Sequence, residues 1–448
     1  MKVNNLPLAG LHDLFGLALR KRDCLSRIFS DIVRNCGYEQ LEVPLIERAS
    51  SFSEGIVGES PWPEWDKRGC FYINILDYSG NYEKIYEKNE ALLIPEGTVS
   101  VSRWLGRKID ENPRFQFPLK VFYNNLPCFR NELVDTLSSS KRRQFNQFGV
   151  EILGSSNVMS DVEILSLSFV MLEKVGINKT DITARISDVR IFSALAKECG
   201  IVHKDSLTLK EAMDTVAECR AGKKPERRVE QERIFWGVID RYTLSDVQKN
   251  CWKTIINHQS GMIHKEIFDL FPSEYHGVLE NLNNVRSVFL SQGLNVKIDL
   301  SVVRSHEYYT GLSFELDVKV EEVKYVEIAG GGRYDKLVGN FVNNTTLSRI
   351  PSTGFAFGIE RVIEMLEKTG FFKKEVKMLS HASFEESSAD LLILASNGSG
   401  PVRGYFDALT VAREEIIKGN RCDIYVGDDS NEPAIVEYMA QRNIKKRG

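Results

Sequence analysis

Apolar side chains recur at helical spacing near the start of the chain. Within residues 16–36 they occupy one face of a helix: Leu25, Ile28, Phe29, Ile32 and Val33. Gly37 follows as a stop signal, so the pattern predicts a helix over this segment. The next segment, YEQLEVPLIE from Tyr38 to Glu47, alternates in the manner of a strand. Because its Pro44 cannot donate to a strand ladder, we expect a strand edge or an interface there.

A hairpin is predicted over residues 119–153, where two strand-like segments surround a polar loop rich in serine and basic residues. Successive side chains alternate across a strand, so the second strand has two distinct faces. One face carries charged, amide and aromatic groups around a glycine: Arg143, Phe145, Gln147, Gly149 and Glu151. The other is an ordinary core face: Phe148, Val150 and Ile152. The first face is either solvent-facing surface or, because Gly149 removes bulk between two hydrogen-bonding groups, the floor of a small-ligand site.

The rest of the chain mixes strands and helices without a regular repeat. Residues 91–105 predict a short buried run, a Pro-Glu-Gly-Thr turn and a helix start, and residues 160–175 predict a helix. Residues 185–290 are mainly helical and highly charged, which indicates an inserted domain. The remaining segments are strands at 294–303 and 312–320, units of strand, glycine-rich turn and helix at 325–339 and 351–368, and strand–helix pairs within 389–448. The order predicts an α+β fold, an antiparallel sheet flanked by helices.

The composition is that of a soluble globular protein, with 42% hydrophobic and 27% charged residues and a formal net charge of -4. An acidic total does not exclude a nucleic-acid partner, because recognition needs only a local basic patch. Three basic clusters are candidates, although such runs are typically solvated faces: Lys141 to Arg143, Lys223 and Lys224 with Arg227 and Arg228, and Lys445 to Arg447. The 8 cysteines and 7 histidines lack ligand spacing and predict neither a zinc site nor a disulfide framework. No apolar run approaches ~18 residues, so we expect no membrane span and a cytoplasmic location.

The glycine-rich segment AGGGRYD, residues 329–335, is open to two interpretations. It has neither the Gly-Lys-Ser/Thr of a phosphate-binding loop nor the spacing of a dinucleotide fingerprint. It is typical of a turn, and its alternative use is a close approach of the backbone to a ligand.

Five segments, taken in their order, resemble the motifs of histidyl-tRNA synthetases, which are class II aminoacyl-tRNA synthetases. Three segments resemble the three class motifs, in order: GYEQLEVPLIE (37–47), FRNE…RRQFNQFGVE (129–151) and GFAFGIERVIEML (354–366). Two more segments narrow the resemblance to the histidine enzymes and their relatives: VVRSHEYYTGLSFE (302–315) and AGGGRYDKLV (329–338). The similarity extends over roughly residues 8–370 and rests on the order and spacing of all five segments, since one alone would be weak evidence.

The resemblance implies ATP-dependent activation of histidine to histidyl-adenylate and transfer to tRNA. Both reacting groups are anionic, so the site needs fixed cations, and the family motifs give the catalytic role to Arg130 and Arg304. The implied ATP contacts are Arg130, Glu132, Arg143, Phe145 and Arg361. The implied histidine contacts are Glu96, Thr98, Gln147, Glu151, Arg304, Tyr308, Tyr309 and Tyr334. Mg²⁺ is expected with ATP, at residues that the motifs do not specify, and a homodimer is expected around Pro44.

Two of these residues also have ordinary interpretations when the resemblance is set aside. Arg361 stands near a helix start, where a cation opposes the helix dipole, and could be a solvated arginine neutralised by Glu360. Tyr308 and Tyr309 could be packing at a strand end.

The resemblance also divides the chain into domains. It implies a catalytic core at 1–180 and 291–371, an inserted, mainly helical domain at 181–290, a linker at 372–388 and a short anticodon-binding-like α/β domain at 389–448.

The sequence departs from the family pattern mainly in segments that would face tRNA. Three departures lie within the motifs: Ile94 before Pro-Glu-Gly-Thr, Leu133 to Asp135 after FRNE, and Ser305, His306 and Glu307 before the tyrosines. The fourth is the last domain, which has two clear strands where a fuller sheet is expected. Two other functions therefore stay open. One is a paralogue that passes histidyl-adenylate to a non-tRNA acceptor in biosynthesis, and the other is a non-catalytic regulatory subunit like that of ATP phosphoribosyltransferase.

Overall fold

The computed structural model places most of the chain. It describes residues 6–58, 69–74, 90–112, 114–131, 142–220, 225–258, 261–303, 307–321, 324–344, 347–368, 389–394, 401–425, 431–442, 444 and 446–447. The chain divides into two compact units, Met1–Asp13 with Leu25–Phe371 and Leu14–Cys24 with Phe372–Gly448. Each unit is described by itself.

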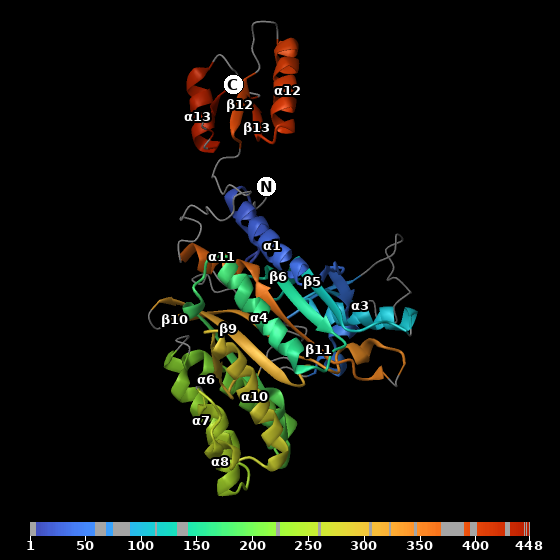
Figure 1. The fold of residues 1–448 in the computed structure, drawn as a ribbon, viewed down its shortest axis with the longest axis vertical. Coiled ribbons are helices and arrows are strands. Elements are labelled where there is room, and N and C mark those ends of the chain that lie inside the picture. The colour runs from blue at the N-terminus through green and yellow to red at the C-terminus, as the bar shows by residue number, and fades with distance from the viewer. Residues whose placement is uncertain are drawn as a thin grey trace, which may run out of the picture. The chain divides into compact units, whose positions relative to one another are not determined.

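An eight-stranded sheet formed by described residues lies at the centre of the first unit (Figure 1). In spatial order its strands are β1 (Glu39–Gln40), β5 (Leu119–Phe129), β6 (Gln144–Leu153), β11 (Ser352–Gly358), β10 (Lys324–Arg333), β9 (Leu312–Glu321), β7 (Ile182–Asp188) and β8 (Asn295–Ile298). Neighbours from β5 through to β7 are antiparallel, while the outer pairs β1–β5 and β7–β8 are parallel. The predicted α+β class with a mostly antiparallel sheet is confirmed.

The two faces of β6 differ as the alternation predicts. Phe148, Val150 and Ile152 are at most 1% exposed. On this side α4 (Val158–Lys174) packs against β6 and β11, and the ring of Phe29 in α1 (Leu17–Asn35) lies 5.5 Å from that of Phe148. The prediction of a core face is therefore confirmed. On the opposite face Gln147 and Glu151 are buried too, so the solvent-facing alternative for that face is wrong.

The predicted strand around Pro44 is interrupted. β1 belongs to the main sheet, whereas β2 (Ile46–Arg48) pairs with β4 (Glu90–Leu93) in a small antiparallel sheet completed by β3 (Phe71–Asn74). Pro44 is exposed and lies in the link between the two sheets, since proline cannot extend a ladder.

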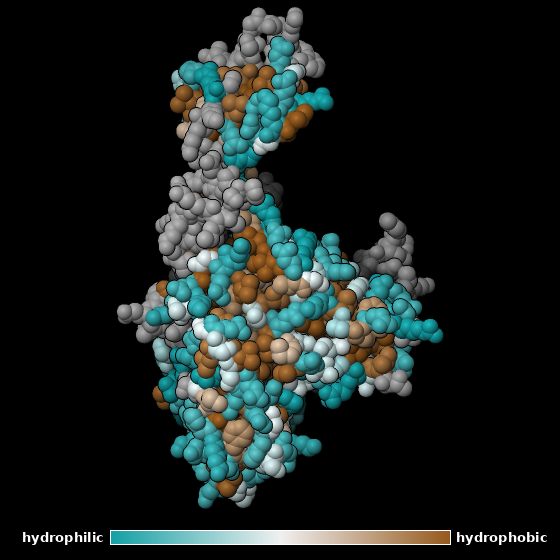
Figure 2. All heavy atoms as spheres, viewed as in Figure 1, coloured by the Kyte–Doolittle hydropathy of each residue, from teal (hydrophilic) through white to brown (hydrophobic). Residues whose placement is uncertain are grey.

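The inserted helices connect two neighbouring parallel strands. They are α5 (Val189–Glu198), α6 (His203–Arg220), α7 (Arg228–Ile239), α8 (Asp246–Asn257), α9 (Lys265–Phe268) and α10 (Ser273–Ser291). The helical part begins after Asp188, later than the expected residue 185, because all of β7 is buried in the sheet. The Asp188 side chain then accepts from the Arg190 amide at 3.0 Å and caps α5. Polar residues cover most of the visible surface of these helices in Figure 2.

One buried ion cluster ties β7 to β9 and to the segment after β8. The Arg185 guanidinium donates to Asp317 at 2.7 Å and to Glu315, and lies 3.5 Å from Asp299. Asp299 also accepts from the Ser301 amide at 3.1 Å. A buried arginine needs such partners because an unpaired buried charge is strongly destabilising. The cluster thus fixes the beginning of the segment that leads to Tyr308.

The glycine run lies within a strand, so the interpretation of residues 330–332 as a turn is wrong. These glycines belong to β10, which pairs with β9 on one side and β11 on the other. A Cβ on Gly331 would lie 2.4 Å from the carbonyl oxygen of Gly354, so the neighbouring strands leave no room for a side chain there.

The remaining elements complete the first unit or belong to the second unit. They are α2 (Glu54–Val57), α3 (Thr98–Glu111), α11 (Ile359–Lys368) and the 3-10 helices Ala49–Phe52, Lys179–Asp181, Pro225–Arg227 and Val338–Phe341. The second unit contains α12 (Pro401–Ile417), α13 (Glu432–Arg442) and a parallel sheet in the order β13 (Cys422–Tyr425), β12 (Leu391–Leu394), β14 (Lys446–Arg447). It thus has a third strand beyond the two that the sequence made clear. Within the described residues no helix is long and apolar enough to cross a membrane.

Candidate functional site

A buried carboxyl group lies at the centre of the site face of the sheet. Glu151 is 1% exposed, and its two oxygens accept hydrogen bonds from the Thr98 hydroxyl at 2.9 Å and the Tyr334 hydroxyl at 2.5 Å. A Cβ on Gly354 of β11 would lie 1.5 Å from Oε2, so the carboxyl occupies the space that this glycine leaves. Burial raises the pKa of Glu151 to about 8, while the two hydroxyl donors oppose the shift.

The Pro-Glu-Gly-Thr turn is fixed to β6 by side chains. The Glu96 carboxyl accepts from the amides of Thr98 at 2.9 Å and Val99 at 2.6 Å, which are the first amides of α3. A carboxyl at a helix start is favoured by the unpaired amides and by the dipole. Burial nevertheless raises the pKa of Glu96, against these amide bonds. Gln147 accepts from the Gly97 amide at 3.0 Å, so Glu96, Thr98, Gln147 and Glu151 lie together.

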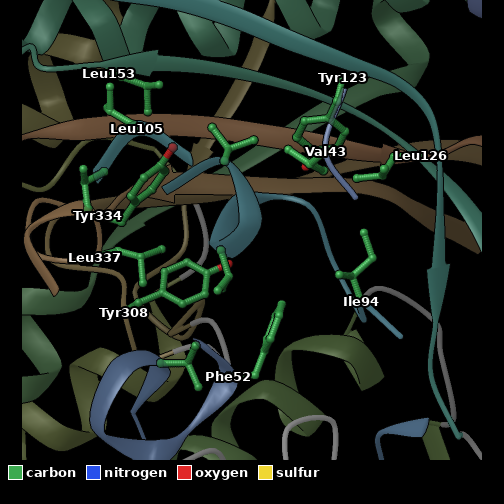
Figure 3. Close-up of a cluster of buried hydrophobic side chains, with 14 of the residues drawn as sticks. Val43, Phe52, Ile94, Leu105, Tyr123, Leu126, Leu153, Tyr308, Tyr334 and Leu337 are labelled. Atoms are coloured by element: carbon green, nitrogen blue, oxygen red, sulfur yellow. The ribbon is translucent and has the colours of Figure 1, made fainter. Parts of the chain in front are cut away.

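Three tyrosines form one side of this cluster. The Tyr308 ring lies 4.8 Å from that of Tyr309 and stands edge-on to Tyr334 at 6.1 Å. Burial raises the pKa values of Tyr308 and Tyr334. Figure 3 shows both side chains among apolar residues such as Leu337, within one buried cluster. The structure therefore brings all the described histidine-binding candidates together.

The space above Gly149 is filled by a side chain of the protein itself. Tyr123 of β5 is paired directly opposite Gly149, and a Cβ on Gly149 would lie 2.0 Å from its Cζ atom. A Cβ on Gly97 would lie 2.4 Å from the same atom. Gly149 does remove bulk from this face, but the buried Tyr123 ring occupies the space that it leaves. Sequence reasoning missed Tyr123, although the hairpin register placing an aromatic residue opposite glycine could have indicated it.

The candidate ATP-binding residues that the structure describes are spread around the end of the hairpin. Arg130 donates from Nε to the Pro95 carbonyl at 3.1 Å, and its guanidinium lies 5.1 Å from the centre of the Phe145 ring. Arg143 accepts the Arg130 amide at its carbonyl at 2.9 Å and donates from Nη1 to Ala9 at 3.3 Å. A cation therefore lies beside the turn that carries Glu96.

Arg361 is exposed in the first turn of α11. The sequence suggests its neighbour Glu360 as a neutralising partner, and in the structure Glu360 binds β6. Glu360 accepts from the backbone and side-chain nitrogens of Asn146 at 2.8 and 2.6 Å. Glu360 thus joins α11 to β6.

Several sequence-based candidates lie outside the described residues. They are Arg304, Glu132, Leu133 to Asp135, Lys141, Lys223, Lys224, Ser305, His306 and the 372–388 linker. In the part of the chain that is described, no group of three or more histidine, cysteine or acidic side chains is placed to hold a metal ion. The described site gathers carboxyl, amide and hydroxyl groups, which are the groups that hydrogen-bond small polar ligands.

Comparisons with known proteins find relatives of this chain. The family model for histidyl-tRNA synthetase matches residues 93–231 and 253–362, more than half of the chain. The chain is 27% identical over 383 residues to histidine–tRNA ligase of Sulfolobus acidocaldarius, covering 85% of this chain and 80% of that protein. It is 28% identical over 380 residues to the Listeria innocua ligase, covering 83% and 76%.

Solved structures share the fold. An ATP phosphoribosyltransferase regulatory subunit/histidyl-tRNA synthetase from Bacillus halodurans has a TM-score of 0.71 at 19% identity, covering 100% of this chain and 99% of that one. Apo histidyl-tRNA synthetase of S. aureus has a TM-score of 0.60 at 21% identity, covering 98% and 89%.

The raised pKa of Glu151 predicts a pH dependence of stability. The unfolded carboxyl releases its proton near ~4.3, whereas the folded one keeps it up to about 8. Between these values the folded state binds more protons, so this group's contribution to stability falls as pH rises. Glu151→Gln removes the titration. The free energy of unfolding of the variant, relative to the parent, should therefore rise between pH 5.5 and 8 in urea titrations.

Glu173→Gln, at an exposed carboxyl of α4, is the control and should show no such rise. Parallel pH curves for the parent and Glu151→Gln would contradict the proposed protonation of Glu151.

The contact between Gly149 and Tyr123 predicts non-additive mutations. Gly149→Ala forces a methyl group into the Tyr123 ring and should lower the free energy of unfolding by about 1–3 kcal/mol. In Tyr123→Leu the same change should be milder, which a double-mutant cycle in urea would measure. Gly277→Ala, in α10 with open space around it, should be neutral or stabilising. Additive effects at 149 and 123 would show that the ring is not what excludes the methyl group.

Proposed function

The chain belongs to the histidyl-tRNA synthetase family, and on this premise we propose that it activates histidine with ATP and transfers the histidyl group to tRNA. In the first step an oxygen of the histidine carboxylate forms a bond to the α-phosphorus of ATP. The bond between that phosphorus and the pyrophosphate oxygen breaks, which gives histidyl-adenylate and pyrophosphate. In the second step a tRNA hydroxyl takes the histidyl group and AMP leaves.

The convergence of Glu96, Gln147 and Glu151 on one buried cluster carries this proposal. Burying carboxyl and amide groups is unfavourable unless they are hydrogen-bonded. Two segments far apart in the chain, the turn that carries Glu96 and strand β6, nevertheless bring these groups together beside Arg130. We assign Glu96, Thr98 and Gln147 to the α-ammonium end of histidine.

Glu151 suits recognition of an imidazole. An imidazole changes protonation near neutral pH, and its two nitrogens can donate or accept. With a pKa of about 8, the Glu151 carboxyl is available both as a donor when neutral and as an acceptor when ionised. Thr98 and Tyr334 fix its orientation, so we assign Glu151 with Tyr309 to the imidazole, and Tyr308 and Tyr334 to the pocket wall.

Arg130 is our first candidate for the α-phosphate, because a planar guanidinium fits a phosphate through two parallel hydrogen bonds. The family motif supplies Arg304 as the second. Glu132, Arg143, Phe145 and Arg361 remain proposed ATP contacts. Mg²⁺ would accompany ATP and neutralise phosphate charge, held mainly by phosphate oxygens and water, as is usual for this ion.

A regulatory role is the second candidate. The neighbour named as an ATP phosphoribosyltransferase regulatory subunit/histidyl-tRNA synthetase matches this chain over nearly its full length. A chain with that role alone would bind histidine without forming its adenylate. A third outcome, adenylate formation without tRNA charging, would indicate another acceptor.

The proposed function predicts histidine-dependent exchange of pyrophosphate into ATP, together with histidine charging of purified tRNA. Arg130→Gln should lower the exchange rate roughly 100-fold or more, as expected when a preorganised charge is removed from a developing anionic centre. Arg107→Gln removes an exposed arginine of α3 that pairs with Glu111, and should leave the rate unchanged. Histidine binding without exchange would favour the regulatory role. Exchange with another amino acid in place of histidine would refute the substrate assignment.

We further propose a homodimer formed through the small sheet. Among the described residues β2 is an edge strand paired with β4, and Leu45 and Ile46 at its start are 38% and 50% exposed. An edge strand with exposed apolar side chains is suited to a partner. Light scattering at micromolar concentration should give twice the chain mass of 50.9 kDa. Ile46→Asp should shift it toward one chain, whereas Val247→Asp, an equally exposed position on α8, should not; a monomeric parent would refute the dimer.

A further inference from the structure

An ion pair joins the inserted helices to the residue that precedes the tyrosine pair. Lys210 of α6 donates to Oε1 of Glu307 at 2.8 Å, and the two side chains are only 14% and 18% exposed. Glu307 is followed directly by Tyr308 and Tyr309. A partly buried pair is less screened by solvent than a surface pair, so it can hold a loop in place.

Glu307 is also held from the opposite side by backbone. Gly58, which ends α2, has φ +80, a conformation that L side chains rarely adopt. A Cβ there would lie 2.3 Å from the Cβ of Glu307 and 3.0 Å from its Oε2. Glu307 is therefore packed between the α2 segment and the inserted helices.

Lys210 is itself positioned by the core of the inserted helices. Its Nζ lies 5.8 Å from the centre of the Phe192 ring of α5, a cation–π distance. Phe192 in turn stands edge-on to the buried Trp252 of α8 at 5.5 Å. Movement of these helices would therefore move the ammonium group that Glu307 contacts.

The segment between β8 and β9 that carries Tyr308 and Tyr309 is called the tyrosine loop. The ion pair borders a cavity between the inserted helices and this loop. The cavity has a volume of about 230 Å³ and is lined by Phe192, Ser193, His203, Val303 and Tyr309 in addition to the pair itself. Close packing is thus incomplete behind Tyr309.

We propose that Glu307 is a positioning residue through which the inserted helices, by way of Lys210, set the orientation of Tyr308 and Tyr309 and hence the affinity for the amino acid. The affinity part rests on the proposed function. The Glu307 carboxyl reaches Lys210 of α6 directly, so the coupling belongs to this chain's own residues.

Three variants test the coupling in the full-length protein. Lys210→Met and Glu307→Asp should each raise the KM for histidine about fivefold, with kcat and the KM for ATP within about twofold of the parent. The exchanged pair, Lys210→Glu with Glu307→Lys, should recover at least part of the histidine KM. Arg241→Gln breaks an ion pair to Asp205 that lies within the inserted helices and should change none of these constants.

Hydrogen exchange on the ligand-free protein separates this inference from the proposed function. Lys210→Met should speed exchange about fivefold or more in the peptide containing Tyr308 to Gly311, and Arg241→Gln should not. If hydrogen exchange in that peptide rises in Lys210→Met but the parent shows no histidine-dependent exchange of pyrophosphate into ATP, the proposed function is refuted and the coupling stands. If exchange in that peptide matches the parent, the coupling is overturned. If Arg241→Gln lowers kcat and the affinity for histidine as much as Lys210→Met does, the coupling is overturned as well, because the effect then reflects a general loss of structure.

Discussion

The burial of one carboxyl group, that of Glu151, is the constraint on which the site depends. A carboxyl removed from water needs hydrogen-bond donors, and an unpartnered one would be strongly unfavourable. Its donors come from Thr98 at the start of α3 and Tyr334 just after β10, which lie 53 and 183 residues away in sequence. The helix start, the hairpin and the end of β10 must therefore meet at one point. The same burial brings the pKa of Glu151 to about 8, so the structural requirement and the chemistry of the site have one cause.

Close approach of side chains to backbone is the second constraint, and it explains the glycines of the sheet. Gly354 makes room for the Glu151 carboxyl, Gly332 for the Tyr309 ring and Gly149 for the Tyr123 ring. Each glycine thus receives a side chain of this protein, and the cluster is packed before a ligand arrives. A site whose groups are already oriented loses less entropy on binding, which favours affinity for a small polar ligand.

Local patterns in the sequence predicted local structure well. The alternation in β6 identified its buried face, and the order of elements gave the fold class, because both depend on neighbouring residues. The contacts of Tyr123 with Gly149, and of Lys210 with Glu307, join residues 26 and 97 positions apart, and periodicity carries no information on such pairs. The glycine run was misjudged for the same reason: a central strand and a turn both tolerate glycine, and only the neighbours β9 and β11 decide between them. The alternation in β6 placed Gln147 and Glu151 on one face, whereas Glu96, Thr98 and the three tyrosines were found through the family resemblance.

The position of the inserted helices follows from the sheet. β7 and β8 are parallel neighbours, so the chain between them must cross over, and the helices are that crossover. Both ends are consequently anchored in the sheet, where Arg185 binds the acidic residues of β9 and Asp299 after β8. The tyrosine loop begins at this same anchor and ends in β9. Because the helices and the loop share one base in the sheet and meet again at Lys210 and Glu307, a displacement of the helices has a short mechanical route to Tyr308 and Tyr309.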